Sequence, residues 1–355
     1  MMPPGRPKGE FRRAAREGPP VRPLLVTMGD AAGIGPEIIA KAFALGELAD
    51  AVVVGDARVM RRAGAAMTAV IDSPDDLSLV PPGCLPVLQP PGLPADLAGL
   101  PPGLLHARHG AAAARCIEHA VALVLGGAGS GIVTAPIHKE AFAAAGVPYP
   151  GHTEMLQALA AAHGAGHPAP AVRMMLANDE LRVVLVTIHL SLRRAVDAVT
   201  FDAVLQTLRI AHRAAAAWGQ PQPRIAVAGL NPHAGEGGLF GDEEGRVIAP
   251  AIAAAVAEGI HASGPFAPDT VFMRARHAPG HPGEFDLVVA MTHDHGLIPV
   301  KYLGVEQGVN VTLGLPFVRT SPDHGTAFDI AGQGRANPAS LVSALRMAHR
   351  LAAVT

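Results

Sequence analysis

The sequence is poor in lysine, cysteine and aromatic residues. Among its 355 residues are four lysines, two cysteines and one tryptophan, and aromatic residues make up 4%. With so few aromatic side chains, the core is expected to consist mainly of Ala, Val, Leu and Ile. The chain also lacks a run of about 18 apolar residues free of charges and turn signals, so neither a transmembrane helix nor a secretory signal is expected.

Charge is also scarce, and it is unevenly distributed. Charged residues make up 16% and hydrophobic residues 49%, which excludes a disordered or highly charged chain. Residues 1–22 hold six basic and two acidic residues, so the rest of the chain has 22 basic and 28 acidic residues and a net charge of −6. This balance argues against nucleic-acid binding by the folded part. Residues 1–22, rich in Pro, Gly and Arg, are expected to be a disordered basic leader.

The two cysteines, Cys84 and Cys116, do not have the spacing of a metal site. They are expected to be reduced and structural, which is typical of a cytoplasmic protein. Together with the charge and the lack of a membrane span, they favour a cytoplasmic protein with neither a nucleic-acid nor a membrane partner.

Short apolar runs alternate with alanine-rich segments of helical periodicity. The expected strands cover residues 24–27, 51–54, 131–134, 183–187, 224–228 and 285–291. The expected helices cover residues 36–45, 111–125, 153–162, 203–218, 247–258 and 338–351. This alternation predicts an α/β fold with a mostly parallel sheet and helices on both faces. Residues 72–106, rich in Pro, Gly and Leu, are expected to be irregular or to form an edge strand.

Ligands of such folds bind beyond the carboxyl ends of the strands. After the first strand, Gly29, Gly33 and Gly35 have a spacing that matches neither the dinucleotide fingerprint nor a phosphate-binding P-loop, so a structural turn and a ligand site are both open. Further along, His152 and Thr153 open a helix and are suited to offer donors to an anion such as a phosphate. A simple capping turn is the alternative.

Three of the expected strands are each followed within a few residues by a histidine. These residues are His189, His233 and His293. Three neutral imidazoles that leave one coordination position open are typical of a catalytic zinc site. Because the three residues are far apart in sequence, three unrelated loop histidines remain the alternative.

Two cations and a glycine-rich segment lie near the C-terminus. Lys301 and Arg319 are suited to bind a phosphate or a carboxylate, with solvated surface charge as the alternative. Residues 323–338 combine glycines with small polar side chains and precede a helix, as in a loop that wraps a planar ligand.

This glycine-rich run is similar to the adenine-binding loop of isopropylmalate and isocitrate dehydrogenases. The full set of motifs resembles more closely the 4-hydroxythreonine-4-phosphate dehydrogenase family of pyridoxal phosphate synthesis, over about residues 23–350. The motifs are G-D-x-A-G-I-G-P-E, T-A-P-I-x-K, G-H-T-E, N-P-H-A-G-E-G-G, H-D-x-G, V-N-V-T-L-G-L-P-F-V-R-T-S and D-H-G-T-A.

The resemblance implies a fold of the isocitrate/isopropylmalate dehydrogenase type, with two α/β/α domains flanking a cleft. Residues 23–135 plus 300–355 would form the cofactor-side domain, and residues 136–299 the domain for metal binding and dimerisation. The active site would lie at the interface of a homodimer, with the metal held by histidines of both subunits. The cofactors would be NAD or NADP and a divalent metal, with zinc preferred over magnesium or cobalt.

The resemblance also implies a reaction and a set of site residues. The reaction would be oxidation of the C3 hydroxyl of 4-phosphohydroxy-L-threonine, followed by decarboxylation to 3-amino-2-oxopropyl phosphate. The implied metal ligands are His189, His233 and His293. The implied substrate-binding residues are His152, Thr153, Lys301, Asn310 and Arg319. The implied cofactor-binding residues are His324, Gly325, Thr326, Asp329 and Asn337. The candidates for proton transfer are Lys301, Asp269 and Asp294, which are not ranked.

The chain departs from the family pattern at several positions, which leaves the substrate open. Ala31 stands where the family usually has Pro, Thr292 where it has Tyr and His295 where it has Gln, and residues 277–284 are extra. The alternatives within the family are 4-phospho-D-threonate or 4-phospho-D-erythronate, and a cis-dihydrodiol of an aromatic acid. A three-histidine zinc hydrolase is the alternative from another class.

Overall fold

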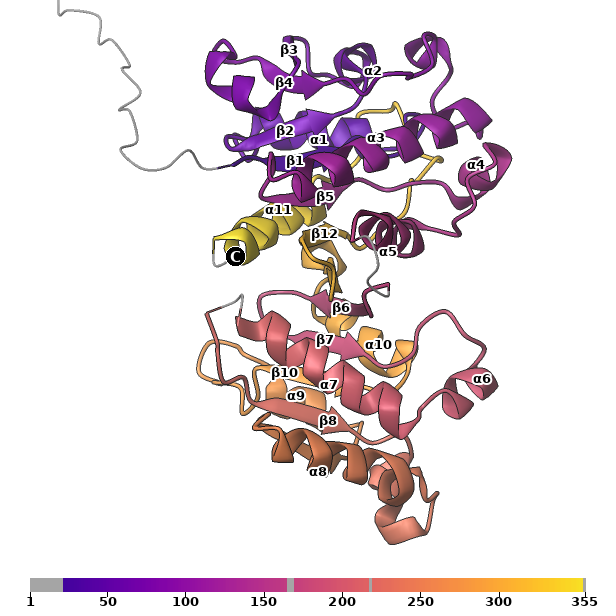
Figure 1. Cartoon of the computed structure of the whole chain (residues 1–355), viewed down its shortest axis with the longest axis vertical. Coiled ribbons are helices and arrows are strands. Elements are labelled where there is room, and N and C mark those ends of the chain that lie inside the picture. The colour runs from indigo at the N-terminus through magenta and orange to yellow at the C-terminus, as the bar shows by residue number, and fades with distance from the viewer. Residues whose placement is uncertain (1–21, 165–168, 217–218, 354–355) are drawn as a thin grey trace, which may run out of the picture.

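The computed structural model of the chain describes residues 22–164, 169–216 and 219–353. The expected basic leader lies outside the described residues except for residue 22, as do the last two residues of the helix expected at 203–218. Figure 1 shows two α/β lobes stacked along the long axis, and the C-terminal helix lies with the N-terminal lobe.

In the described part of the chain, one twelve-stranded sheet runs through both lobes in the order β3-β4-β2-β1-β5-β12-β11-β6-β7-β10-β8-β9. The strands are β1 (Leu24–Thr27), β2 (Ala51–Val54), β3 (Thr68–Ile71), β4 (Leu85–Leu88), β5 (Gly131–Thr134), β6 (Arg173–Ala177), β7 (Arg182–Leu185), β8 (Ile225–Ala228), β9 (Ala262–Phe266), β10 (Leu287–Ala290), β11 (Val309–Leu313) and β12 (Val318–Pro322). Pairing is parallel except in the middle, where β11 is antiparallel to β12 and β6, and β6 is antiparallel to β7. The expected mostly parallel α/β sheet is confirmed.

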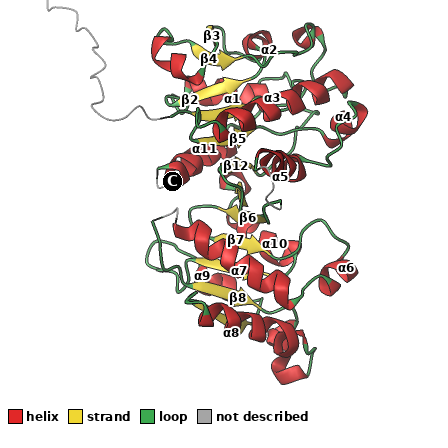
Figure 2. Cartoon of the chain, viewed as in Figure 1, coloured by secondary structure: helices red, strands yellow, loops and turns green. Residues whose placement is uncertain are grey.

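Helices flank the strands in both lobes (Figure 2). The α-helices are α1 (Gly35–Ala44), α2 (Ala57–Arg62), α3 (Ala107–Leu125), α4 (Lys139–Ala144), α5 (His152–His163), α6 (Leu192–Asp197), α7 (Phe201–Ala216), α8 (Ala249–Ala257), α9 (Val271–Ala275), α10 (His293–Leu303) and α11 (Ala339–Ala352). Among the described residues, none of these helices combines the length and the apolar character that crossing a bilayer requires.

All six expected strands and all six expected helices are present, with shifts at their ends. The largest shift is at α3, which begins at Ala107 because the His106 side chain accepts a hydrogen bond from the Arg108 amide and caps the helix there. The helix expected at 247–258 begins as a short π-helix, Glu244–Ile248, before α8.

The expectation that residues 72–106 are irregular or form an edge strand is wrong for Leu85–Leu88. This segment is β4, which pairs with both β2 and β3 and whose residues are all buried. Its sequence is apolar throughout, as expected of a strand covered on both faces. The edge strand at this end of the sheet is β3, and the strand at the opposite edge is β9. The division of the chain into two sets of residues stays a prediction, because the sheet continues from β11 to β6 without interruption.

Alternating side chains of the central strands pack against helices on opposite faces of the sheet. In the C-terminal lobe, Val184 and Val289 belong to the larger core together with residues of α7 and α8. Their neighbours Val183 and Val288 belong to a second core together with residues of α9 and α10. Because successive side chains of a strand point to opposite faces, both faces of this sheet are buried.

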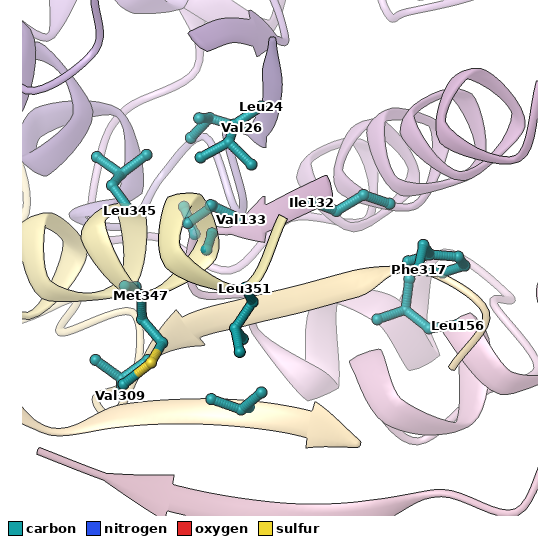
Figure 3. Packing of buried hydrophobic residues seen from close by; sticks show 14 of the residues in the cluster. Leu24, Val26, Ile132, Val133, Leu156, Val309, Phe317, Leu345, Met347 and Leu351 are labelled. Atoms are coloured by element: carbon teal, nitrogen blue, oxygen red, sulfur yellow. The ribbon is translucent and has the colours of Figure 1, made fainter. Parts of the chain in front are cut away.

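Aliphatic residues make up most of the core of the N-terminal lobe, as the composition predicted. Figure 3 shows Leu24 and Val133 of the sheet near Leu345, Met347 and Leu351 of α11. Burying a Leu or Val side chain contributes about 1.5–3 kcal/mol to stability. The segments that follow the strands are therefore attached to a rigid, well-packed base.

Candidate functional site

A pocket of about 670 Å³ is lined by residues from both lobes. Part of its lining comes from the middle of the sheet, from Met174 of β6, Asn310 of β11 and Arg319 of β12. The pocket therefore lies over the antiparallel central strands as well as beyond the strand ends. It brings together His152, Thr153, His189, His293, Lys301, Asn310, Arg319, His324 and Gly325, all of them predicted site residues.

Arg319 is the buried cation of this pocket. It is 3% exposed, and its guanidinium donates to Thr312 Oγ1 at 2.9 Å and to Thr134 Oγ1 at 2.7 Å. Its Nε is buried without a hydrogen-bond partner among the described residues. Burial lowers the pKa of Arg319 to about 10. A buried cation bonded only to hydroxyl groups is unfavourable unless an anion completes its environment, which indicates an anion-binding site.

A buried neutral imidazole lies in the same part of the pocket. His152 begins α5, and its Nε2 is buried without a hydrogen-bond partner among the residues described. Burial lowers the pKa of His152 well below its usual value, and the charges of Arg319 and Lys139 lower it further. The neutral ring has one N–H donor to offer to a ligand.

Lys139 is a pocket residue that the sequence analysis did not assign to a site. It begins α4 and is exposed within the pocket lining. The available signal was its rarity, because only four lysines occur in the chain and this one lies within five residues of the end of an expected strand. With Arg319, it gives this part of the pocket two cations.

Lys301 and Asn310 complete the predicted polar lining. Lys301 Nζ lies 2.5 Å from Asp323 Oδ2, and the Asp323 amide in turn donates to Ser340 Oγ at 3.2 Å. This ion pair fixes the direction of the ammonium group at the pocket. Asn310 of β11 lines the same pocket.

Two of the three predicted metal ligands lie together. The ring centroids of His189 and His293 are 5.7 Å apart. Two imidazoles bound to one tetrahedral zinc, at Zn–N distances of about 2.0–2.1 Å, would have centroids about 5 Å apart, so this pair fits two positions of such a site. Burial, Lys139 and His293 together lower the pKa of His189, which favours the neutral form that a metal ligand needs.

Asp294 orients one of these rings. Its Oδ1 lies 2.8 Å from His293 Nδ1, which leaves Nε2 of that imidazole for a ligand. His189 has a left-handed backbone with φ of 49°. Such a conformation is costly for a non-glycine residue and is characteristic of functional sites.

His233 does not join this pair within one chain. Among the described residues, no group of three or more His, Cys, Asp or Glu side chains is arranged to hold a metal. His233 is exposed, and its ring centroid lies 6.0 Å from that of Phe240. The predicted set of three histidines is therefore not formed inside a single chain.

The loop that carries His233 is strained and firmly anchored. Residues 233–237 all have positive φ, including the non-glycine residues His233, Ala234 and Glu236. The buried carboxylate of Glu244 accepts from the Leu230 and Asn231 amides, both at 2.7 Å. An exposed histidine on an anchored loop is the geometry that a ligand donated to a second subunit requires.

Asp269 lies away from the pocket in the single chain. It is exposed and precedes α9, and it is not part of the pocket lining. Its proposed role in proton transfer stays a prediction.

The predicted cofactor loop lies beside the pocket and rests on the first glycine turn. His324 and Gly325 line the pocket, whereas Thr326 is buried and its carbonyl accepts from the Ile34 amide at 2.9 Å. A Cβ on Gly33 would lie 2.9 Å from the Thr326 Cβ, so the glycine permits this close approach.

The remaining cofactor-loop residues, Asp329 and Asn337, are exposed and lie outside the pocket. Asn337 Oδ1 accepts from the Ala339 amide at 3.0 Å at the start of α11. A second cavity of about 430 Å³ lies next to this loop and is lined in part by Gly33, Lys41 and Gly334.

Residues 47–348 match the family model described as pyridoxal phosphate biosynthetic protein PdxA. The chain belongs to the PdxA family. A 4-hydroxythreonine-4-phosphate dehydrogenase of Beijerinckia indica is 56% identical over 93% of this chain and 95% of the relative. A D-threonate 4-phosphate dehydrogenase of Pectobacterium atrosepticum is 45% identical over 93% of this chain and 99% of that protein. A crystal structure of a 4-hydroxythreonine-4-phosphate dehydrogenase from Klebsiella pneumoniae superposes with a TM-score of 0.82, at 45% identity, over 93% of this chain and 99% of that one.

Membership of the PdxA family confirms the resemblance inferred from the motifs, the fold class and the expectation of an oxidoreductase. It does not decide between the phosphorylated substrates, because relatives with two different names match over nearly the full chain. The metal ligands, the cofactor residues and the dimer remain predictions.

The positions Ala31, Thr292 and His295 do not line the 670 Å³ pocket, but Thr292 lines an adjacent cavity together with His189 and His293, and Ala31 lines the second cavity. Thr292 is buried directly before α10, and His295 within α10 has a buried Nδ1 without a hydrogen-bond partner among the described residues. The extra segment 277–284 forms a turn that is closed by a bridge between Ala278 and His281.

Proposed function

We propose that the chain oxidises the C3 hydroxyl of 4-phosphohydroxy-L-threonine with a nicotinamide cofactor, and that decarboxylation then gives 3-amino-2-oxopropyl phosphate. The observation that carries this proposal is the buried guanidinium of Arg319, which lines the pocket and, within the described part of the chain, donates only to hydroxyl groups. A substrate with a phosphate group and a carboxylate supplies the negative charge that this environment lacks.

The substrate would be held by the cations and donors at one end of the pocket. Arg319 and Lys139 would neutralise an anionic group, and the neutral ring of His152 would donate a hydrogen bond to it. Asn310 and Thr153 would contact the polar groups of the carbon chain. These contacts orient the C3 hydroxyl toward the histidine pair and so lower the entropic part of the barrier.

The divalent metal would be held by His189 and His293 of one subunit and by His233 of the partner subunit. Support comes from the spacing of the first two rings and from the exposed, anchored position of the third residue. A metal bound there lowers the pKa of a hydroxyl group and stabilises negative charge on oxygen. This arrangement requires a homodimer with the active site at the interface.

Lys301 would act on the later, decarboxylating part of the reaction. Its ammonium group is held by Asp323 at the edge of the pocket, where it would stabilise the enolate that develops as CO2 leaves. Of the three candidates for proton transfer, Lys301 lines this pocket, whereas Asp294 is bonded to His293 and Asp269 lies elsewhere.

The nicotinamide cofactor supplies the hydride acceptor. His324, Gly325 and Thr326 would contact it next to the substrate, and Asn337 would contact its adenosine. The exposed carboxylate of Asp329 would accept from the ribose hydroxyls and would repel a 2′-phosphate, so NAD is favoured over NADP.

The second candidate substrate is 4-phospho-D-threonate or 4-phospho-D-erythronate. It is favoured by the 45% identity with the D-threonate 4-phosphate dehydrogenase. A cis-dihydrodiol of an aromatic acid would offer Arg319 a carboxylate but would lack the phosphate that the relatives' substrates carry. A zinc hydrolase would have no use for the loop of residues 323–338.

The deciding experiment measures NADH formation with each of the three phosphorylated acids, with and without a chelator. We expect turnover with 4-phosphohydroxy-L-threonine and its loss on chelation. Preference for 4-phospho-D-threonate or 4-phospho-D-erythronate would select the second candidate. Full activity after exhaustive chelation would refute the metal, and no turnover with any of the acids would refute the proposed reaction.

A further inference from the structure

The far end of the cofactor loop is attached to helix α1 by a single lysine. Lys41 Nζ donates to the Gly334 carbonyl at 2.8 Å and to the Ala336 carbonyl at 2.6 Å. The same nitrogen lies 2.9 Å from Glu37 Oε1. An ammonium group has three N–H donors, so all three are engaged.

Glu37 holds the same stretch of backbone from a second direction. It is 7% exposed, and its Oε1 accepts from the Ala336 amide at 2.8 Å. Glu37 and Lys41 are one helical turn apart, so both side chains project from the same face of α1. Both the N–H and the C=O of Ala336 are therefore bonded to this pair of side chains.

The loop is thus attached to one short segment of the chain at two points. Near its start, Thr326 is bonded to Ile34, and near its end, Gly334 and Ala336 are bonded to Lys41. Gly334 has a φ of 71° and no side chain with which to pack, so its backbone position depends on the hydrogen bonds it makes. Asn337 directly follows this second attachment.

We propose that Lys41 and Glu37 are positioning residues for the nicotinamide cofactor. They fix the backbone of residues 334–336, so that Asn337 is presented to the adenosine in a preformed geometry. The inference rests on the proposed role of this loop in cofactor binding. Preorganising the loop lowers the conformational entropy that binding would otherwise cost.

The choice of lysine at position 41 fits this role. The chain uses arginine for nearly all of its cations, yet three acceptors converge on Lys41 Nζ: the Gly334 and Ala336 carbonyls and the Glu37 carboxylate. A compact ammonium can donate to three converging acceptors, whereas a planar guanidinium presents its donors in a rigid fork. Lys41→Arg is therefore not expected to restore the attachment.

The test is cofactor binding by the full-length Lys41→Met protein, measured by titration calorimetry with NAD. Methionine keeps the apolar stem and removes all three donors. We expect the Kd for NAD to rise roughly tenfold, since hydrogen bonds from a charged donor are lost. The KM for NAD should rise in parallel, whereas kcat at saturating NAD and the KM for the phosphorylated acid should stay within about twofold.

A second readout needs neither cofactor nor turnover. Amide hydrogen exchange of residues 329–337 in the unliganded protein should be faster in Lys41→Met than in the wild type, because the loop opens more often. The matched control is Arg346→Met, which breaks the exposed pair with Glu47 near the end of α1 and leaves the loop contacts intact. This control should behave as the wild type in both measurements.

Unchanged NAD affinity together with unchanged exchange in Lys41→Met would overturn the inference. If that variant does not fold, Glu37→Gln replaces it, because glutamine keeps the acceptor for the Ala336 amide and loses the charge opposite Lys41. Weaker NAD binding by Glu37→Gln would support the positioning role, and wild-type affinity would overturn it. A wild-type protein that binds no nicotinamide cofactor would overturn the proposed function as well, so the two failures are distinguishable.

Discussion

Replacing Arg319 by methionine tests whether the buried guanidinium lowers the free energy of unfolding of the unliganded protein while it serves to bind an anion. Burial lowers the pKa of Arg319 to about 10, and the shift from the usual pKa of an arginine corresponds to about 3 kcal/mol. The pKa of Arg319 is lower in the folded state than in the unfolded chain. At neutral pH, where the guanidinium is charged in both states, this difference lowers the free energy of unfolding. The unliganded protein therefore carries this unfavourable free energy at pH 7.

The loss of hydrogen bonds works in the opposite direction. Thr134 and Thr312 each lose a donor when the guanidinium is removed, which costs about 1 kcal/mol for each hydroxyl. The free energy of unfolding of Arg319→Met should therefore equal that of the wild type within about 1 kcal/mol, or exceed it. Removing one partner of a buried ion pair would instead cost about 3–5 kcal/mol.

The assay is urea unfolding with and without inorganic phosphate, followed by steady-state kinetics. Phosphate at about 100 times its Kd should stabilise the wild type by about 2.7 kcal/mol and should not stabilise Arg319→Met. The kcat/KM for the phosphorylated acid should fall by at least about a hundredfold, since a charge-assisted contact is lost. The control is Arg173→Met, which removes a partly buried arginine of β6 that bonds Thr207 and does not line the pocket.

The reasoning would be refuted by the opposite pattern. A variant that is destabilised by about 3 kcal/mol or more, and that is still protected by phosphate and still turns over substrate with an unchanged KM, would show that Arg319 is a structural residue. The wild-type response of Arg173→Met is needed to assign any lost protection to the pocket.

Three further predictions concern the glycine turn and the shared metal site. Asp30 is buried, and mainly for that reason its pKa is raised to about 6. The folded state therefore favours the protonated carboxyl, and the stability that this adds is present below about pH 4 and is lost as the pH rises through 6. In urea titrations, Asp30→Asn, which keeps the acceptor for the Ala32 amide, should gain about 3 kcal/mol relative to the wild type between pH 4 and pH 8; a constant difference would contradict this pKa. Gly33→Ala should lower the free energy of unfolding by about 1–3 kcal/mol and raise the KM for NAD, because the new Cβ would meet Thr326, and wild-type values for both would count against the close approach. The His189→Ala and His233→Ala proteins should each be inactive, and a mixture of equal amounts that is allowed to exchange subunits should regain about a quarter of wild-type activity. Half of the dimers are then mixed, and each mixed dimer has one intact site. No recovery of activity would exclude a shared site.

The sequence predicted the parallel strands better than the middle of the sheet. Strands such as Leu24–Thr27 and Gly131–Thr134 are continuous apolar runs between helices, which is a strong local signal. Strands β11 and β12 are interrupted by the polar residues Asn310 and Arg319, because these side chains form the pocket. Asn310 and Arg319 thus interrupt the apolar pattern from which β11 and β12 could have been predicted as buried strands.

The site residues divide in the same way. Motif resemblance predicted that His152, Lys301 and Arg319 belong to one site, and they line one pocket. No local pattern could show that His233 lies apart from the other two histidines. The strands that precede the three residues are neighbours in the order β7-β10-β8, and the separation arises in the left-handed loop of residues 233–237. If His233 is donated to a second subunit, as we propose, its place in the site depends on the assembly and not on the single chain.

The scarcity of lysine is explained by where the lysines of the described part of the chain lie. Lys139 and Lys301 line the 670 Å³ pocket, and Lys41 attaches the loop of residues 323–338 to α1. Surface ion pairs of the chain, such as Arg209–Glu258 and Arg274–Glu284, are built instead from arginine. Arginine suits these pairs because its fork matches a carboxylate, whereas a compact ammonium suits acceptors that converge from several directions. A substitution of lysine by arginine at position 41 should therefore weaken NAD binding, as measured by titration calorimetry. Exchanging arginine for lysine at the surface pairs should leave the urea midpoint nearly unchanged.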